Sequence, residues 1–258
     1  MKPQRLFPLF LSFLYIWSCS ASPSPQKIQL AKDKDPQYQY NMGLFYLNNS
    51  QVDEAVKHLN KALALNPRHY LAWNAMGLAS SMKGDLEGSI AAFQKCLEIN
   101  PQFSEAHNNL GSIYQEMDVP GKAEDEFRKA LLDPTYNSRE LPLYNLARMY
   151  FTQGKLPEAY GFAHRAVQTK PRFAMAHNLK GLILEKMGSL EEAISSYEQA
   201  ARIVPDDMNF VFNLGTALFK NKDYGRAREA FEKILPMVTD MEMRKTINEC
   251  MAVIRKNQ

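Results

Sequence analysis

The stretch "AWNAMGLASSMKGDLEGSIAAFQKCLEINP" (residues 72–101) carries the spacing that organises this chain. Its glycine is one member of a series of small residues: Gly43, Gly77, Gly111, Ala147, Gly181 and Gly215. Each step in the series is 34 residues long except the step from Gly111 to Ala147, which is 36. A nearly constant step of this length predicts a tandem repeat rather than one irregular domain.

Other residue types keep the same step and phase. Large side chains follow the small series by 16 residues, at Leu59, Phe93, Phe127, Tyr197 and Phe231, with Ala163 in the fourth place. Proline closes four of the units, at Pro67, Pro101, Pro171 and Pro205. This order of aromatic, glycine, aromatic and proline residues resembles the tetratricopeptide repeat. Within the quoted stretch the matching residues are Trp73, Gly77, Phe93 and Pro101.

The resemblance implies an all-α fold, a tetratricopeptide-repeat α-solenoid. It would contain six helix-turn-helix repeats and a C-terminal capping helix, wound into a right-handed superhelix. The repeats, together residues 36–241, align as 36–69, 70–103, 104–137, 140–173, 174–207 and 208–241. Residues 242–258 follow as the capping helix and tail, because their apolar side chains fall on one helical face. We expect each small residue to lie where two helices cross closely, and each proline to end a second helix.

The longer step falls within "LLDPTYNSRELPLYNLA" (residues 131–147). The two extra residues lie in the turn around Asn137 to Arg139 and leave Ala147 in register. Pro142 falls in the first turn of the next helix, where proline is tolerated. We predict that this insertion changes the superhelical pitch between repeats three and four, and that it divides the groove into two halves.

The first residues have the layout of a secretory signal peptide. A basic start precedes an apolar run that is shorter than the roughly 20 residues of a membrane-spanning helix. Two processing sites are open: Cys19 ends a stretch that resembles a bacterial lipobox, and Ala21 offers an ordinary cleavage site. We expect residues 1–18 to be a lipoprotein-type signal peptide, Cys19 to be lipidated, and residues 19–35 to form a flexible tether.

Composition and motifs argue against catalysis and against nucleic-acid or metal binding by this chain. The formal net charge is +3, and loss of Lys2 and Arg5 with the signal peptide would leave about +1, too little to favour nucleic acid. No HExxH, CxxC, Walker or GxGxxG motif occurs, and the five histidines lack the spacing of a metal site. We expect no enzyme activity, catalytic residue, metal, cofactor or small-molecule substrate. Cys96 and Cys250 fall on apolar helical positions, which favours buried free thiols.

Proteins of this repeat type usually bind their partners in the concave groove, at positions two, five, nine and twelve of the first helices. The predicted partner-binding residues are Tyr40, Leu44, Asn74, Leu78, Asn108, Tyr144, Arg148, Phe151, Asn178, Leu182, Phe212 and Phe219. They suit a protein partner that presents an extended apolar segment or a helix. Two alternatives stay open: the aromatic residues pack against neighbouring repeats, and the asparagines bond neighbouring helices instead of a ligand. Tyr40 and Leu44 stand where the family's clamp for chaperone carboxylates needs Lys and Asn, which argues against that ligand.

The order of lipobox, polar tether, six repeats and an irregular junction, "FRKALLDPTYNSRELPLYNLARMYFTQGKLPEAY" (residues 127–160), resembles type IV pilus lipoproteins of the PilF/PilW type, or pilotins. The resemblance implies a protein lipid-anchored at Cys19 to the periplasmic face of the outer membrane. It would bind pilus secretin subunits and assist their localisation and assembly. The alternatives are a generic periplasmic scaffold for other envelope machinery, such as peptidoglycan enzymes, a soluble periplasmic or secreted protein, and a lumenal co-chaperone.

Overall fold

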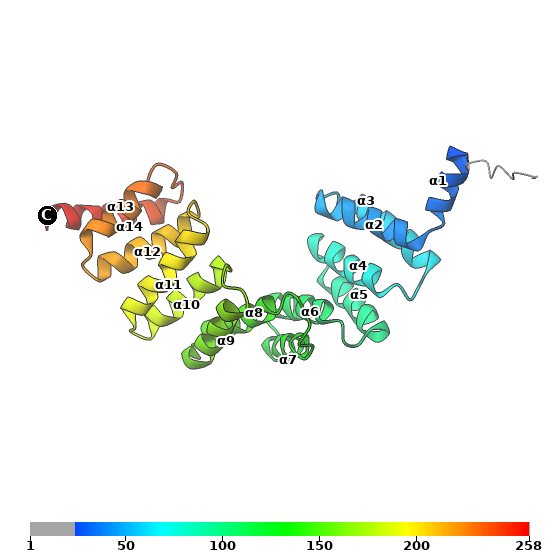
Figure 1. The fold of residues 1–258 in the computed structure, drawn as a ribbon, viewed down its shortest axis with the longest axis horizontal. Helices are drawn as coiled ribbons and strands as arrows, with labels where there is room; N and C mark the ends of the chain where they lie inside the picture. The colour runs from blue at the N-terminus through cyan, green and yellow to red at the C-terminus, as the bar shows by residue number, and fades with distance from the viewer. Residues whose placement is uncertain (1–23, 258) are drawn as a thin grey trace, which may run out of the picture.

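The computed structural model describes residues 24–257, and these residues form fourteen helices and no strand. The predicted all-α helical-repeat fold is confirmed. Helix pairs follow one another along an arc from α1 to the C-terminus (Figure 1). The pairs are α2 (Pro36–Asn48) with α3 (Val52–Leu65), α4 (Tyr70–Met82) with α5 (Leu86–Ile99), α6 (Ser104–Glu116) with α7 (Pro120–Ala130), α8 (Glu140–Thr152) with α9 (Leu156–Thr169), α10 (Ala174–Lys186) with α11 (Leu190–Ile203), and α12 (Met208–Lys220) with α13 (Tyr224–Ile234).

Each helix pair turns at a residue in the left-handed region of backbone conformation. This residue occupies the same place in all six repeats: Ser50, Gly84, Asp118, Gly154, Gly188 and Lys222. A left-handed residue ends an α-helix and reverses the chain. Because three of the six carry a side chain where glycine is favoured, the repeat geometry imposes this turn even where the residue type does not.

The small-residue series lies where the two helices of a repeat cross. A Cβ atom on Gly111 would lie 2.7 Å from Cδ1 of Phe127, and one on Gly181 would lie 2.5 Å from Cε1 of Tyr197. Both aromatic side chains are fully buried. The offset of 16 residues in the sequence is therefore a direct contact between the two helices.

The fourth repeat forms this crossing with a different pair of residues. Ala147 stands in place of glycine and Ala163 in place of the large side chain, and both are 0% exposed. The added methyl group on α8 is thus matched by a smaller side chain on α9. The paired exchange keeps the crossing closely packed, as protein interiors require.

The first helices of neighbouring repeats lie against one another. α2 contacts α4, and the same holds for each following pair of first helices up to α10 and α12. Within residues 24–257, consecutive second helices make no direct contact of this kind. Because the first helices approach more closely, they lie on the concave side of the arc; Figure 1 shows α6 and α8 inside α7 and α9. We call this side the inner face.

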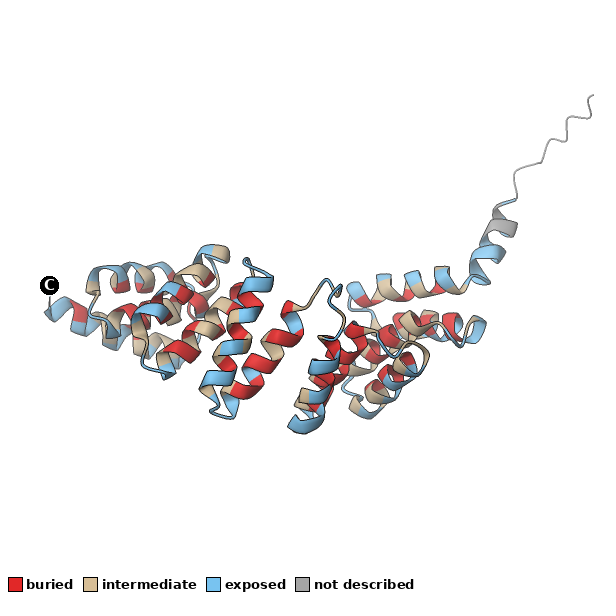
Figure 2. Ribbon diagram, turned by 60° about the horizontal axis from the view of Figure 1, so that its bottom comes forward, coloured by how far each residue is buried: buried red, intermediate tan, exposed pale blue. Residues whose placement is uncertain are grey.

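The two inserted residues lie in the segment between α7 and α8. Nη1 of Arg139 holds this segment by donating hydrogen bonds to the carbonyl oxygens of Leu131 (3.2 Å) and Asp133 (2.6 Å). The core is not interrupted here, because one buried cluster extends from Phe93 in the second repeat to Ile183 in the fifth. Figure 2 shows buried residues between the helices along the whole array. The insertion therefore alters the surface and leaves the core continuous; the change in pitch stays a prediction.

The N-terminal end differs from expectation. Residues Pro25–Asp33 form α1, although the sequence analysis placed them in a flexible tether. Nε2 of the buried Gln39 lies 3.5 Å from the carbonyl oxygen of Lys32 and 3.4 Å from that of Asp33. The carbonyl oxygen of Lys32 also accepts a bond from the backbone N–H of Asp35, and the contacts with Gln39 attach the end of α1 to the solenoid. The tether prediction is wrong for this segment.

The C-terminal end is covered by α14 (Met241–Lys256). The helix begins after Asp240, whose carboxylate accepts a hydrogen bond from the backbone N–H of Met243 at 2.7 Å. Ile247 and Ile254 are fully buried in the cluster of the last repeat. α14 thus shields apolar surface that the sixth repeat would otherwise expose.

Candidate protein-binding surface

All twelve predicted groove residues lie on the first helices, α2 to α12. Asn74 and Asn108 are buried, Arg148 is exposed, and the other nine are half-buried. Half-buried side chains have one part in the core and another part free for a partner. The assignment of these residues to partner binding stays a prediction.

Aromatic residues of this set also pack within the solenoid. The ring of Tyr40 lies 5.0 Å from the ring of His69, and that of Tyr144 lies 5.4 Å from that of Phe173. Burial raises the pKa of both tyrosines, so their hydroxyl groups stay neutral. These rings support the loops between repeats, which agrees with the packing alternative for part of each side chain.

The asparagines join adjacent repeats. In each pair, a side-chain amide nitrogen of one repeat donates to the asparagine oxygen of the repeat before it: Asn109 to Asn74 (3.3 Å), Asn145 to Asn108 (3.1 Å), and Asn213 to Asn178 (2.8 Å). The structure therefore supports the alternative that these asparagines bond neighbouring helices. Their partners, at position six of each repeat, were not among the predicted residues.

The inner face changes character at the insertion. At position two of the third repeat stands the exposed carboxylate of Glu105. At the same position in repeats four and five stand Leu141 and Met175, which are 37% and 48% exposed. The inner face therefore presents polar groups in the third repeat and exposed apolar groups in the fourth and fifth.

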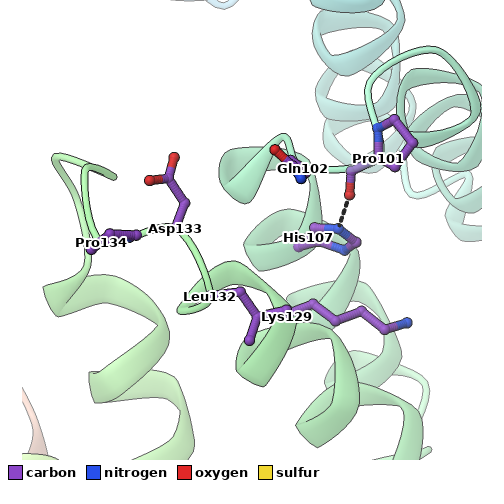
Figure 3. Close-up of a pocket in the computed structure, with 7 residues that line it drawn as sticks. All are labelled: Pro101, Gln102, His107, Lys129, Leu132, Asp133 and Pro134. Atoms are coloured by element: carbon purple, nitrogen blue, oxygen red, sulfur yellow. Dashed lines mark hydrogen bonds between the residues drawn. The ribbon is translucent and has the colours of Figure 1, made fainter.

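A pocket of about 570 Å³ adjoins the insertion, and we call it the His107 pocket (Figure 3). Its lining residues are Pro101, Gln102, His107, Lys129, Leu132, Asp133 and Pro134.

His107 and Lys129, which line the His107 pocket, are already paired. Nδ1 of His107 lies 2.6 Å from Oε2 of Glu126, and Nε2 lies 3.0 Å from the carbonyl oxygen of Pro101. Nζ of Lys129 donates to Oε1 of the same glutamate at 2.7 Å. Burial opposes ionisation of Glu126, but the hydrogen bonds from His107 and Lys129 outweigh it and lower its pKa. These contacts fix the pocket wall, and Leu132, which is 78% exposed, adds an apolar side chain to the lining.

A second pocket, of about 480 Å³, lies beside the same loop, and we call it the Glu105 pocket. Its lining residues are Asn100, Gln102, Phe103, Ser104, Glu105, Asp133, Thr135, Tyr136, Asn137 and Ser138. Both pockets form where the loop before α6 meets the inserted loop before α8. Neither pocket was predicted from the sequence, in which the 36-residue step is the signal that accompanies them.

Cys96 is a buried free thiol. Burial and the nearby charge of Glu105 raise the pKa of the Cys96 thiol to about 12, so the thiol stays protonated. Residues 24–257 contain no cluster of three or more His, Cys, Asp or Glu residues that could hold a metal ion. No helix in the same range is long and apolar enough to cross a membrane. The predicted signal peptide and Cys19 lie outside the described residues.

The fold and inner face define a helical-repeat solenoid, and comparison with known families identifies the repeat. Models described as tetratricopeptide repeats match residues 36–69, 82–118, 144–208 and 178–241. The chain is a tetratricopeptide-repeat protein, as its sequence spacing predicted.

Among individual proteins, the chain is similar to the type IV pilus assembly protein PilF of Pseudomonas aeruginosa, with 26% identity over 163 residues. The match covers 62% of this chain and 64% of PilF. The BBSome complex member BBS4 of Bos taurus is 27% identical over 189 residues, which is 73% of this chain and 36% of that protein. This chain therefore spans less than two thirds of either relative.

Solved structures show the same fold. The Pseudomonas aeruginosa PilF structure superposes with a TM-score of 0.77 at 16% identity, covering 85% of this chain and 99% of that one. The structure of PilW, a type IV pilus biogenesis factor, gives a TM-score of 0.73 at 19% identity, covering 82% and 97%. This chain thus resembles PilF and PilW in fold over most of its length.

Proposed function

We propose that this chain is a non-catalytic lipoprotein of the bacterial cell envelope that assists type IV pilus biogenesis. It would bind secretin subunits and promote their localisation to the outer membrane and their assembly there. The observation that carries the proposal is the likeness to PilF in sequence together with an inner face suited to a protein segment. Tetratricopeptide repeats are a protein-binding fold, which supports the same class of function.

The inner face of repeats four and five suits the client. Leu141 and Met175 are exposed there, and Tyr144 and Phe151 add half-buried aromatic surface. A row of apolar groups on adjacent helices is the surface that an extended apolar segment or an amphipathic helix recognises. We place the secretin-binding site on repeats four to six.

The lipid anchor would keep this surface at the membrane. Acyl chains on Cys19 contribute about 0.8 kcal/mol of membrane affinity per buried methylene group. Because α1 begins at Pro25, few residues separate Cys19 from the folded solenoid. The tethered inner face would then meet secretin subunits at a raised effective concentration.

Replacing Cys19 with alanine is expected to move the protein from the membrane fraction to the soluble fraction, because the acyl chains supply the membrane affinity. Fractionation and mass spectrometry of the mature protein measure this. The matched control is Cys250→Ala, which removes a half-buried thiol from α14 and should leave fractionation unchanged. Lipidation at Cys19 is refuted if the variant keeps the mass and the fractionation of the wild type.

Replacing both Phe151 and Phe219 with alanine is expected to lower secretin recovery by about tenfold or more, since buried aromatic anchors carry much of the energy of an interface. The measurement is a pull-down from envelope extract with the purified protein, quantified for secretin. The control is Phe45→Ala, which truncates a phenylalanine that is 56% exposed and outside the predicted groove set.

Three outcomes contradict parts of the proposal. Wild-type protein that does not enrich secretin above background excludes the secretin function, and enrichment of peptidoglycan enzymes instead supports the scaffold alternative. Unchanged recovery with the double variant excludes these two side chains as anchors. Loss of helicity in the double variant, measured by circular dichroism, assigns them to the core.

A further inference from the structure

We propose that the Glu105 pocket receives a basic side chain, lysine or arginine, from an extended partner segment lying along the inner face. The proposal rests on the protein-binding function proposed above and adds the chemistry of the partner. The repeat pattern does not predict a pocket at this place. The pocket lies between the start of α6 and the inserted loop before α8. The volume of about 480 Å³ lies within the range of pockets that hold small ligands.

Two carboxylates line this pocket, and no lysine, arginine or histidine does. Glu105 accepts a hydrogen bond from Nδ2 of Asn74 at 3.0 Å and forms no ion pair within residues 24–257. Asp133 accepts two bonds from Thr135 through a single oxygen, Oδ1, at 2.8 and 2.7 Å. Both carboxylates therefore keep acceptor capacity for a charged donor.

The nearest positive groups do not neutralise this charge. The guanidinium group of Arg139 donates to the carbonyl oxygens of Leu131 and Asp133. Hydrogen bonds from Thr135 and, to a smaller extent, the charge of Arg139 lower the pKa of the Asp133 carboxyl, so Arg139 offsets part of the negative charge. The N-terminus of α6 contributes only about half a positive charge, against two carboxylates. The pocket therefore keeps a net negative charge, which favours a cation and disfavours an anion.

The neighbouring Tyr136 reports the same negative potential. Burial, together with the charges of Glu105 and Glu140, raises its pKa to about 12. Glu140 is buried and paired with Lys170 at 2.7 Å, so it is not free to bind a ligand. Of these two glutamates, Glu105 is thus the one that a ligand can reach.

Ser104 gives an independent indication of a ligand. The residue lines the pocket and is 4% exposed, and its Oγ, which is out of contact with solvent, has no hydrogen-bond partner in the described part of the chain. A buried polar group without a partner is unfavourable. Once the Ser104 side chain turns toward the pocket, an N–H donor there would supply the missing partner, and an ammonium or guanidinium group carries several such donors.

The position of the pocket indicates that the lysine or arginine side chain would come from an extended partner segment. Glu105 stands at position two of the third repeat, in the row that continues with the exposed Leu141 and Met175. A segment running along this row would place a basic residue against repeat three and apolar residues against repeats four and five. A partner of this chemistry matches the inner face of repeats three to five.

The test uses N-acetyl-arginine amide and its neutral isostere N-acetyl-citrulline amide as probes of the purified full-length protein. We expect the arginine probe to shift the backbone amide NMR signals of Ser104, Glu105 and Tyr136 saturably, with a dissociation constant of ~1 mM for a ligand of this size. The citrulline probe should cause no comparable shift. Equal shifts with both probes, or no saturable shift with arginine, overturn the proposal.

The matched variants are Glu105→Gln and Glu116→Gln, which remove one charge each from the two ends of α6. Glutamine at position 105 retains an oxygen that accepts the bond from Asn74, so folding should not change. We expect about tenfold weaker arginine binding in Glu105→Gln, because bonds to charged groups are the strong ones, and wild-type binding in Glu116→Gln. An unchanged affinity in Glu105→Gln also overturns the proposal. Failure here, with secretin recovery intact, would leave the proposed function standing.

Discussion

Replacing Phe127 with alanine is expected to lower the free energy of unfolding by about 3–5 kcal/mol, the usual loss for a fully buried aromatic side chain. Phe127 is 0% exposed and lies in the cluster that joins repeats two to five. Its ring fills the space above Gly111, so its loss leaves a cavity between α6 and α7 that the backbone closes only in part. Because each repeat is stabilised by its neighbours, the loss should affect the whole array.

Urea titration followed by circular dichroism measures this change. The control is Phe45→Ala, which removes the same number of atoms from a side chain that is 56% exposed and should change stability by less than about 1 kcal/mol. A loss below about 1 kcal/mol for Phe127→Ala would show that the crossing of α6 and α7 is not a centre of stability.

Adding a methyl group at the same crossing is expected to destabilise the protein as well. Gly111→Ala should cost about 1–3 kcal/mol, the range for overpacking a closed core. The new Cβ would lie 2.7 Å from the ring of Phe127 and 3.2 Å from the carbonyl oxygen of Ala123, and neither can move away easily. The control is Gly161→Ala in α9, where a Cβ meets nothing within 4 Å. There alanine should stabilise the helix by up to ~1 kcal/mol.

The double variant tests whether the two residues act as a pair. With Phe127 already alanine, Gly111→Ala should become neutral or stabilising, because the methyl group then enters the vacated space. The native fourth repeat has this combination, Ala147 with Ala163, and both are fully buried. A double-mutant cycle measures the coupling energy. Additive effects in the cycle would refute the assignment of these positions as a contacting pair.

The candidate site was predictable in part. Spacing within one repeat assigned the first-helix positions, and all twelve predicted residues lie on first helices. What each side chain contacts was not predictable, as the asparagines show. Asn109, Asn145 and Asn213 bond asparagines 35 or 37 residues away, and such contacts depend on how consecutive repeats are rotated against each other. A repeat alignment contains no information on that rotation.

The sequence by itself determined the repeat, its length, the pairing of small and large residues across each crossing, and the place of the insertion. These follow from local physical constraints, because the spacing of apolar residues in a helix and the bulk allowed at a crossing are expressed within 34 residues. Only the tertiary structure decided that Pro25–Asp33 is helical, that asparagines join the repeats, and that a negatively charged pocket forms beside Glu105. These features arise between segments that belong to different repeats. Their distances are set by the stacking of whole helix pairs, to which every residue of the core contributes.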